Sequence, residues 1–411
     1  MTRGRRILAS AGAAITAVLS LVPGAPDAAH ADDAALRARV LAALRGSTAA
    51  QTAAGVDVDG LGRAVDVNAL TMLPPASTQK LYTGATALLV LGTDFRFRTE
   101  VRATGPVLAD GTVNGDLVLV GGGDPTLVGD DLQRLAFEVA NAGIRRIGGW
   151  LYVDDTRWDR ARSAPGWKPG WLGDEVAPLS SLLVDGNRWR RDAAYLQNPA
   201  VPNLDRFRVA LDRAGVTIAG PNALGPAPAS PGDLVVSHDS APLAALVGRM
   251  LKDSNNTYAE VLLKELGRTA GDASTNGGIA VVWRTAASFG MGPGQTADGS
   301  GLSLHDRAAP WHEVDWLINV SRTPVADYIR FSLPLACGDG TLQQRFCATP
   351  AAGKVFAKTG SLDGVSTLAG YTTTASGRRV AFSFELAGCR STASCRDAID
   401  RAVISIVTYT G

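Results

Sequence analysis

Residues 81–91 form a run that is apolar on nearly every side of the helix it favours. Such a helix is stable inside a domain, because none of its faces suits contact with water. Pro74 and Pro75 precede the run, where proline is compatible with helix entry, and Gly92 follows it as a stop signal. The sequence therefore predicts a buried central helix, with position 77 on its first turn.

The segment that leads into this helix, P-P-A-S-T-Q-K, contains the only Ser-x-x-Lys spacing in the chain. Residues three apart share one face of a helix, so the Lys80 amine can lie beside the Ser77 hydroxyl. A serine hydroxyl is a weak nucleophile until a base removes its proton, and burial makes a lysine a better base. Alternatively, Ser77 caps the helix and Lys80 faces solvent. The apolar character of the helix favours the catalytic interpretation.

A second polar fragment, Ser254-Asn255-Asn256, lies in a short break between two helical patterns. Its hydroxyl and amide groups can face a cleft there, although serine and asparagine are also common helix N-caps. The similar S-T-N at 274–276 lies in a glycine-rich loop, so we expect a turn at that position.

A third fragment, Lys358-Thr359-Gly360 with Ser361 behind it, follows a strand-like run that ends at Ala357. On an edge strand it can present a cation and a hydroxyl to a carboxylate, while the glycine lets a substrate approach the backbone. Taken alone, the same residues also suit a strand end with a turn glycine.

The three fragments occur in the order Ser-x-x-Lys, Ser-x-Asn, Lys-Thr-Gly, which is the signature of penicillin-binding proteins and serine β-lactamases. The chain resembles one family of these, the D-alanyl-D-alanine carboxypeptidase/endopeptidase class of penicillin-binding protein 4 type (peptidase family S13, low-molecular-weight class C). Other stretches resemble this family's sequences: G-D-L-V-L-V-G-G-G-D-P-T-L, V-D-D-T-R-W, A-P-L-S-S-L-L-V-D-G-N, S-A-P-L, D-G-S-G-L-S and G-D-G-T-L.

The resemblance implies an α+β fold. A transpeptidase/β-lactamase-like catalytic domain, with an antiparallel sheet flanked by helices, is expected at 32–94 and 236–411. A smaller β-rich domain is expected to interrupt it at 95–235. Ahead of them, a cationic head, an apolar stretch and the small-residue pattern A-H-A predict a signal peptide at 1–31 and therefore an exported protein; an uncleaved membrane anchor is the alternative.

The resemblance also implies roles for individual residues. Ser77 is expected to be the acylated nucleophile, Lys80 its base, Ser254 a proton shuttle and Asn256 a ligand of the substrate amide. In the substrate-binding set, Lys358 and Thr359 are expected to bind the terminal carboxylate of a D-Ala-D-Ala peptide. The backbone N–H groups of Ser77 and Ser361 are expected to form the oxyanion hole, with Gly360 beside them, and Asp154 is expected to contact the amino group of a diaminopimelate side chain.

Cysteine usage and net charge add two expectations. An exported chain permits disulfides, and among the three possible connectivities we favour the local pairs Cys337–Cys347 and Cys389–Cys395, with free buried thiols as the alternative. A formal net charge of +1 gives no reason to expect nucleic acid as a partner. No metal or cofactor is expected, peripheral membrane contact is left open, and the sequence does not define an oligomeric state.

Three competing functions remain at this point. The favoured one is a serine DD-peptidase that cleaves D-Ala-D-Ala or D-Ala-diaminopimelate bonds of peptidoglycan peptides and is acylated by penicillins. The second is a β-lactamase or esterase on the same scaffold, and the third is a non-catalytic cell-wall binding module. A Ser-His-Asp hydrolase is disfavoured, because G-x-S-x-G is absent and His238, His305 and His312 lie in no catalytic pattern.

Overall fold

The computed structural model describes residues 34–187, 197–225 and 232–411. The predicted signal peptide lies outside these residues. Within the described ranges, no helix is both long and apolar enough to cross a membrane.

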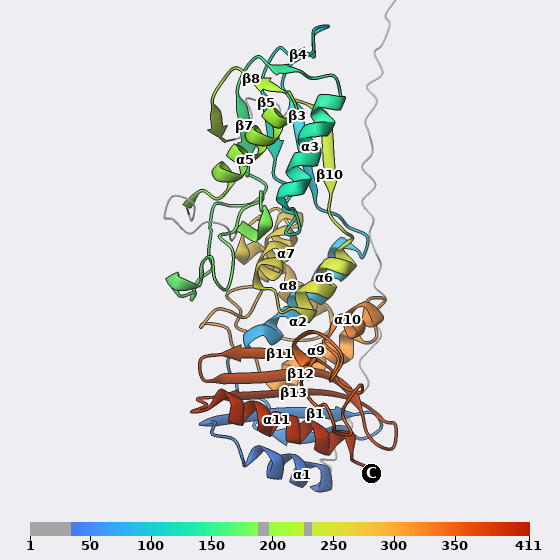
Figure 1. Ribbon diagram of the computed structural model, residues 1–411. Coiled ribbons are helices and arrows are strands. Elements are labelled where there is room, and N and C mark those ends of the chain that lie inside the picture. The colour runs from blue at the N-terminus through green and yellow to red at the C-terminus, as the bar shows by residue number, and fades with distance from the viewer. Residues whose placement is uncertain (1–33, 188–196, 226–231) are drawn as a thin grey trace, which may run out of the picture. The chain divides into compact units, whose positions relative to one another are not determined.

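A five-stranded antiparallel sheet combines strands from the two ends of the described chain (Figure 1). Its order is β11 (Phe356–Leu362), β12 (Val365–Thr373), β13 (Arg379–Ala387), β1 (Gln51–Val58) and β2 (Gly62–Val67). Helices α1 (Ala34–Leu44) and α11 (Thr392–Val407) cover one face through a buried apolar layer. β11 is an edge strand, as the third motif suggested.

Helices cover the opposite face of this sheet. A second apolar cluster joins α2 (Lys80–Leu91), α6 (Leu243–Lys252), α7 (Asn256–Thr269), α8 (Thr275–Ser288), α9 (Pro310–Val320) and α10 (Ala326–Ser332). α2 is buried along most of its length, as its composition predicted.

A mixed sheet is built from strands between residues 98 and 239. Its order is β10 (Asp233–Asp239), β3 (Arg98–Ala103), β5 (Leu117–Val120), β7 (Leu151–Asp154) and β9 (Asn222–Leu224), with a small parallel sheet of β4 (Thr112–Val113), β6 (Arg146–Ile147) and β8 (Thr217–Ile218). Helices α3 (Gly129–Asn141) and α5 (Ala200–Arg213) share its apolar core. The α+β class is therefore confirmed, while the proposed division into domains stays a prediction.

Two local expectations were wrong. The last motif does not follow a strand, because β11 begins at Phe356 and continues through Lys358, Thr359 and Gly360 to Leu362. The S-T-N at 274–276 is a helix start and not a turn, since the Ser274 side chain accepts a hydrogen bond from Gly277 N and caps α8.

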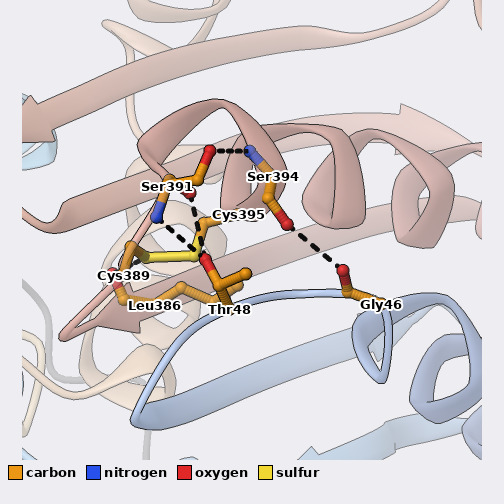
Figure 2. Close-up of a disulfide and its surroundings, with 7 residues drawn as sticks. All are labelled: Gly46, Thr48, Leu386, Cys389, Ser391, Ser394 and Cys395. Carbon is orange, nitrogen blue, oxygen red and sulfur yellow. Dashed lines mark hydrogen bonds between the residues drawn. A yellow bond between two sulfur atoms is a disulfide. The ribbon is translucent and has the colours of Figure 1, made fainter.

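Both favoured disulfides, Cys337–Cys347 and Cys389–Cys395, are present. The second holds the end of β13 to the first turn of α11 (Figure 2). Beside it Ser391 caps α11 by accepting from Ser394 N, and Ser391 N donates to Thr48 Oγ1 at 3.0 Å. The bridge thus fastens the C-terminal helix to β13, and the hydrogen bonds beside it join the start of this helix to the loop that follows α1.

Candidate active site

Ser77 lies on a short 3-10 helix, η1 (Ala76–Gln79), which continues directly into α2. The sequence predicted an α-helical turn here, whereas the structure has a tighter 3-10 turn that is closely packed against its surroundings. Ala76 has a φ of 49°, and a Cβ on Gly301 would lie only 1.7 Å from the Ala76 carbonyl oxygen. Glycine at 301 is therefore required for the loop to pass beneath the turn.

Lys80 is fully buried and its amine contacts three oxygens. Lys80 Nζ lies 2.9 Å from Ser77 Oγ, 2.7 Å from Asn256 Oδ1 and 2.6 Å from the Ser300 carbonyl oxygen. The spacing in the sequence therefore does bring the amine to the hydroxyl. The amide of Asn256 is oriented by its Nδ2, which donates to the Glu175 carbonyl oxygen at 2.9 Å.

Burial changes the acidity of this amine. Desolvation lowers the pKa of Lys80 from 10.5 to about 8, because the charged form loses hydration. The negative charges of Asp298, Glu260, Asp306 and Glu175 act in the opposite direction and raise this pKa. A substantial fraction of Lys80 is therefore neutral in mildly alkaline solution, as a general base requires.

Ser254 and Asn256 flank the residue that caps α7. The Asn255 side chain accepts from Tyr258 N at 3.1 Å, while Ser254 has a φ of 57°. Asn255 is therefore the N-cap residue of α7, and Ser254 and Asn256 on either side of it face the cleft. Ser254 Oγ accepts a hydrogen bond of 2.8 Å from Lys358 Nζ, so the second and third motifs are in direct contact.

The third motif supplies one buried cation and one accessible hydroxyl. Lys358 Nζ also donates to the Thr359 carbonyl oxygen at 2.7 Å, and desolvation, followed by the nearby Lys80 charge, holds its pKa well below 10.5. A Cβ on Gly360 would lie 2.1 Å from Thr367 Oγ1 and 2.8 Å from the Pro75 carbonyl oxygen. The glycine therefore lets β11 approach the Ser77 turn, whereas we had expected it to admit substrate.

The motifs meet at a cleft of about 520 Å³. Five of the predicted residues line it: Ser77, Ser254, Asn256, Thr359 and Ser361. Lys80, Lys358 and Gly360 are buried behind this wall. Asp154 is not part of the wall, because it ends β7 and its carboxylate accepts from Thr156 N at 2.9 Å and Thr156 Oγ1 at 2.6 Å.

Several contributors were not singled out from the sequence. Thr341 lines the cleft and its Oγ1 lies 2.8 Å from Thr359 Oγ1. Ser300 contributes its carbonyl oxygen to Lys80. Each lies in a stretch that the family resemblance had highlighted, G-D-G-T-L and D-G-S-G-L-S, but only tertiary structure reveals which atom is used.

Asp298 supports the loop that reaches Lys80. Its buried carboxylate accepts from Ser300 N at 3.0 Å, Gly301 N at 2.6 Å and Ser303 N at 2.7 Å, and from Trp167 Nε1 at 2.7 Å. These bonds fix the position of the Ser300 carbonyl oxygen, which accepts a hydrogen bond from the Lys80 amine. In the described part of the chain, no group of three or more His, Cys, Asp or Glu side chains is arranged to hold a metal ion.

Comparisons with known proteins agree with this architecture. The D-Ala-D-Ala carboxypeptidase 3 (S13) family matches residues 37–198 and 192–407. A D-alanyl-D-alanine carboxypeptidase from an Actinomadura species is 33% identical over 383 aligned residues, covering 73% of this chain and 70% of the relative. The D-alanyl-D-alanine carboxypeptidase DacB of Haemophilus influenzae is 28% identical and covers 77% of this chain and 81% of its own.

Solved structures give the same result for the fold. Penicillin binding protein 4 from Haemophilus influenzae superposes with a TM-score of 0.81 at 24% identity, covering 90% of this chain and 99% of that protein. Its complex with a novel β-lactam superposes with a TM-score of 0.72 at 25% identity, covering 89% and 98%.

Together the fold and these matches define a serine peptidase of the penicillin-binding class. The chain belongs to the D-Ala-D-Ala carboxypeptidase 3 (S13) family, and its resemblance to proteins of penicillin-binding protein 4 type is confirmed.

Proposed function

We propose that this chain cleaves the D-Ala-D-Ala or D-Ala-diaminopimelate bond of peptidoglycan peptides through an acyl-enzyme on Ser77. The observation that carries this proposal is the position of the Lys80 amine, 2.9 Å from the Ser77 hydroxyl oxygen and shielded from water. Membership of the family supports the same reaction class.

The contacts of Lys80 suggest how the base is oriented. A neutral amine has two protons and one lone pair. The Asn256 and Ser300 oxygens can only accept hydrogen bonds, so the two N–H groups of the neutral amine donate to them. The lone pair is then directed at the Ser77 hydroxyl, whose proton it removes as Oγ attacks the substrate carbonyl.

The second motif completes the proton path. Lys358 donates to Ser254 Oγ, which leaves the Ser254 hydroxyl proton free to pass to the leaving amine. Lys358 and Lys80 lie close enough for the charge of Lys80 to lower the pKa of Lys358. Proton uptake by Lys80 therefore favours release of a proton by the Lys358–Ser254 pair toward the leaving group.

The rim of the cleft provides substrate contacts in this proposal. Thr359, whose hydroxyl donates to Thr341 in the free cleft, turns this donor to the terminal carboxylate when substrate binds, and Thr341 offers a second one. Lys358 lies behind them and supplies positive potential. The backbone N–H groups of Ser77 and Ser361, both in the cleft wall, form the oxyanion hole. Asp154 stays a proposed contact for a diamino side chain, one that requires substrate to extend beyond the cleft wall.

The proposal places this reaction outside the cytoplasm. A cleaved leader at 1–31 and two disulfides fit an exported protein. Residues 32–94 and 236–411 then form the catalytic domain, and 95–235 form the inserted one. β-Lactams are proposed as covalent inhibitors, by analogy with the β-lactam complex of the Haemophilus influenzae protein.

Release of D-alanine from a peptide ending in D-Ala-D-Ala tests this function directly. The mature protein should release D-alanine catalytically, and it should open benzylpenicillin only slowly, because the acyl-enzyme persists. Rapid benzylpenicillin turnover without D-alanine release would favour the β-lactamase alternative. Absence of both reactions would favour a binding module.

A further inference from the structure

A carboxyl group that the proposed mechanism does not use lies directly beneath the nucleophile turn. Glu313 projects from α9 and is fully buried. Its Oε1 is hydrogen-bonded to Thr78 Oγ1, and its Oε2 accepts a 2.6 Å hydrogen bond from Ser383 Oγ of β13. Thr78 is the residue next to Ser77, so the carboxyl group holds the turn that carries the nucleophile.

The protons in this cluster can be counted. Thr78 Oγ1 also lies 2.8 Å from the Pro75 carbonyl oxygen, which can only accept. A threonine hydroxyl has one proton to donate. Thr78 can bond both oxygens only if it donates to Pro75 and accepts from Glu313. Glu313 must then be a neutral carboxylic acid.

The surroundings of Glu313 favour the neutral form. Burial raises its pKa from 4.5 to about 7, although the Ser383 and Thr78 hydroxyls lower this pKa because they can donate to the ionised carboxylate. The nearest acid facing it is Glu385, whose two oxygens have no hydrogen-bond partner among the described residues. Other titratable groups on the same face of the sheet, on α2 or on α9 are Asp57 of β1, Arg63 and Asp66 of β2, Lys358 of β11, Tyr371 of β12, Arg379 of β13, Lys80 and Tyr82 of α2, and His312 and Asp315 of α9.

We propose that Glu313 is a positioning residue that acts on Ser77 through Thr78, and that it does so only as the protonated acid. The neutral acid donates to Thr78, and Thr78 donates to Pro75, so the two bonds tie both sides of Ser77 to α9. Ionisation removes the donated proton, and the Thr78 hydroxyl must then turn to the carboxylate and lose its bond to the Pro75 carbonyl oxygen, which keeps only the bonds from Thr78 N and Thr367 Oγ1. The Ser77 hydroxyl then loses its alignment with the Lys80 amine.

This inference rests on the proposed function, and acylation kinetics test it. The second-order rate of acylation by benzylpenicillin is measured by intact mass between pH 6 and 8.5 for the wild type and for Glu313→Gln. A glutamine amide donates to Thr78 and accepts from Ser383 at every pH. The ratio of the variant rate to the wild-type rate should therefore rise about eightfold between pH 6.5 and 8, as the neutral fraction of the glutamate falls.

Two further variants test whether the pH dependence of acylation comes from Glu313. Ser383→Ala removes a donor that stabilises the carboxylate, so the alkaline fall in acylation should move to higher pH. Glu385→Gln is the matched control, because it removes a buried carboxyl group that does not contact Thr78, and the wild-type fall should remain. If Glu313→Gln does not fold, the direction of the Ser383→Ala shift decides the question.

The inference would be overturned if the acylation rates of the wild type and Glu313→Gln had the same pH dependence. It would also be overturned if the alkaline fall in the acylation rate of Ser383→Ala occurred at the same pH as in the wild type. Ser77→Ala separates this failure from failure of the proposed function. If Ser77→Ala is not acylated but the wild-type and Glu313→Gln profiles coincide, only the proposed role of Glu313 is wrong. Acylation of Ser77→Ala removes the proposed nucleophile itself.

Discussion

At the scale of single residues, the Lys80 amine is the group on which the site depends. Its three contacts come from three separate parts of the chain: the turn before α2, the start of α7 and the loop at 298–303. Each contact has a defined donor or acceptor role. The geometry thus combines burial, which lowers the pKa of the amine to about 8, with acceptors that orient the lone pair of its neutral form.

Replacement of Lys80 by arginine should abolish this base, because a guanidinium does not lose its proton in proteins. We expect acylation by benzylpenicillin to slow by about 100-fold or more, the usual contribution of general base catalysis. Lys264→Arg is the matched control, since Lys264 is an equally buried lysine that pairs with Asp159 away from the cleft. Acylation of Lys80→Arg at the wild-type rate would show that another group is the base.

At the scale of elements, the disulfides act on different parts of the molecule. Cys337–Cys347 closes the loop that contains η4 (Gly340–Leu342), and this short helix brings Thr341 to the cleft. Cys389–Cys395 instead fastens α11 on the far face of the sheet. We therefore expect the first bridge to affect substrate binding and the second to affect only the stability of the fold.

Removing each bridge by paired serine substitutions should separate these effects. By loop length, either removal should cost about 2 to 3 kcal/mol of unfolding free energy in urea titrations. Only the Cys337–Cys347 variant should also raise the KM for a D-Ala-D-Ala peptide, because Thr341 loses its fixed position. Equal KM values in the two variants would contradict a role for the first bridge at the cleft.

Elements with strong local signals were predictable from the sequence. The apolar run at 81–91 predicted α2, which begins one residue earlier, at Lys80. Local patterns did not predict the 3-10 form of the Ser77 turn, against which Gly301 and Gly360 from distant parts of the chain pack closely. Nor did they predict the start of β11, since its register depends on pairing with β12.

Some residues of the candidate site were likewise predictable from the sequence, and others were not. Ser77, Lys80, Ser254, Asn256 and the Lys-Thr-Gly strand carry recognisable spacing, and the structure brings them together around one cleft or directly behind it. Thr341, Asp298 and Glu313 carry no such spacing. Thr341 and Glu313 contribute through contacts with residues distant in sequence, and Asp298 through backbone N–H groups of its own loop, neither of which a local sequence pattern reveals.

At the scale of the whole molecule, buried acids couple stability to pH. Burial raises the pKa of Glu313 to about 7 and of Glu260 to about 8, and it raises those of Asp306 and Glu385 as well. A raised pKa in the folded state means that protons bind the folded chain more tightly than the unfolded one. The added stability is complete below the unfolded pKa and is lost as pH rises through the folded pKa.

The free energy of unfolding should therefore fall between pH 5 and pH 7. Glu313 alone contributes about 2 kcal/mol to this change, from the difference between 4.5 and about 7. Urea titrations at pH 5, 6 and 7 measure the slope, and Glu313→Gln should make it shallower. A free energy that rises over this range would contradict the burial of neutral carboxyl groups.

The central claim is a covalent acyl-enzyme on Ser77, and mass spectrometry of the mature protein after exposure to benzylpenicillin tests it most directly. We predict one adduct with the full mass of the penicillin, located on the peptide that contains Ser77, and none on Ser77→Ala. An adduct on the Ser77→Ala protein, or one that maps to a different residue of the wild type, would contradict the account.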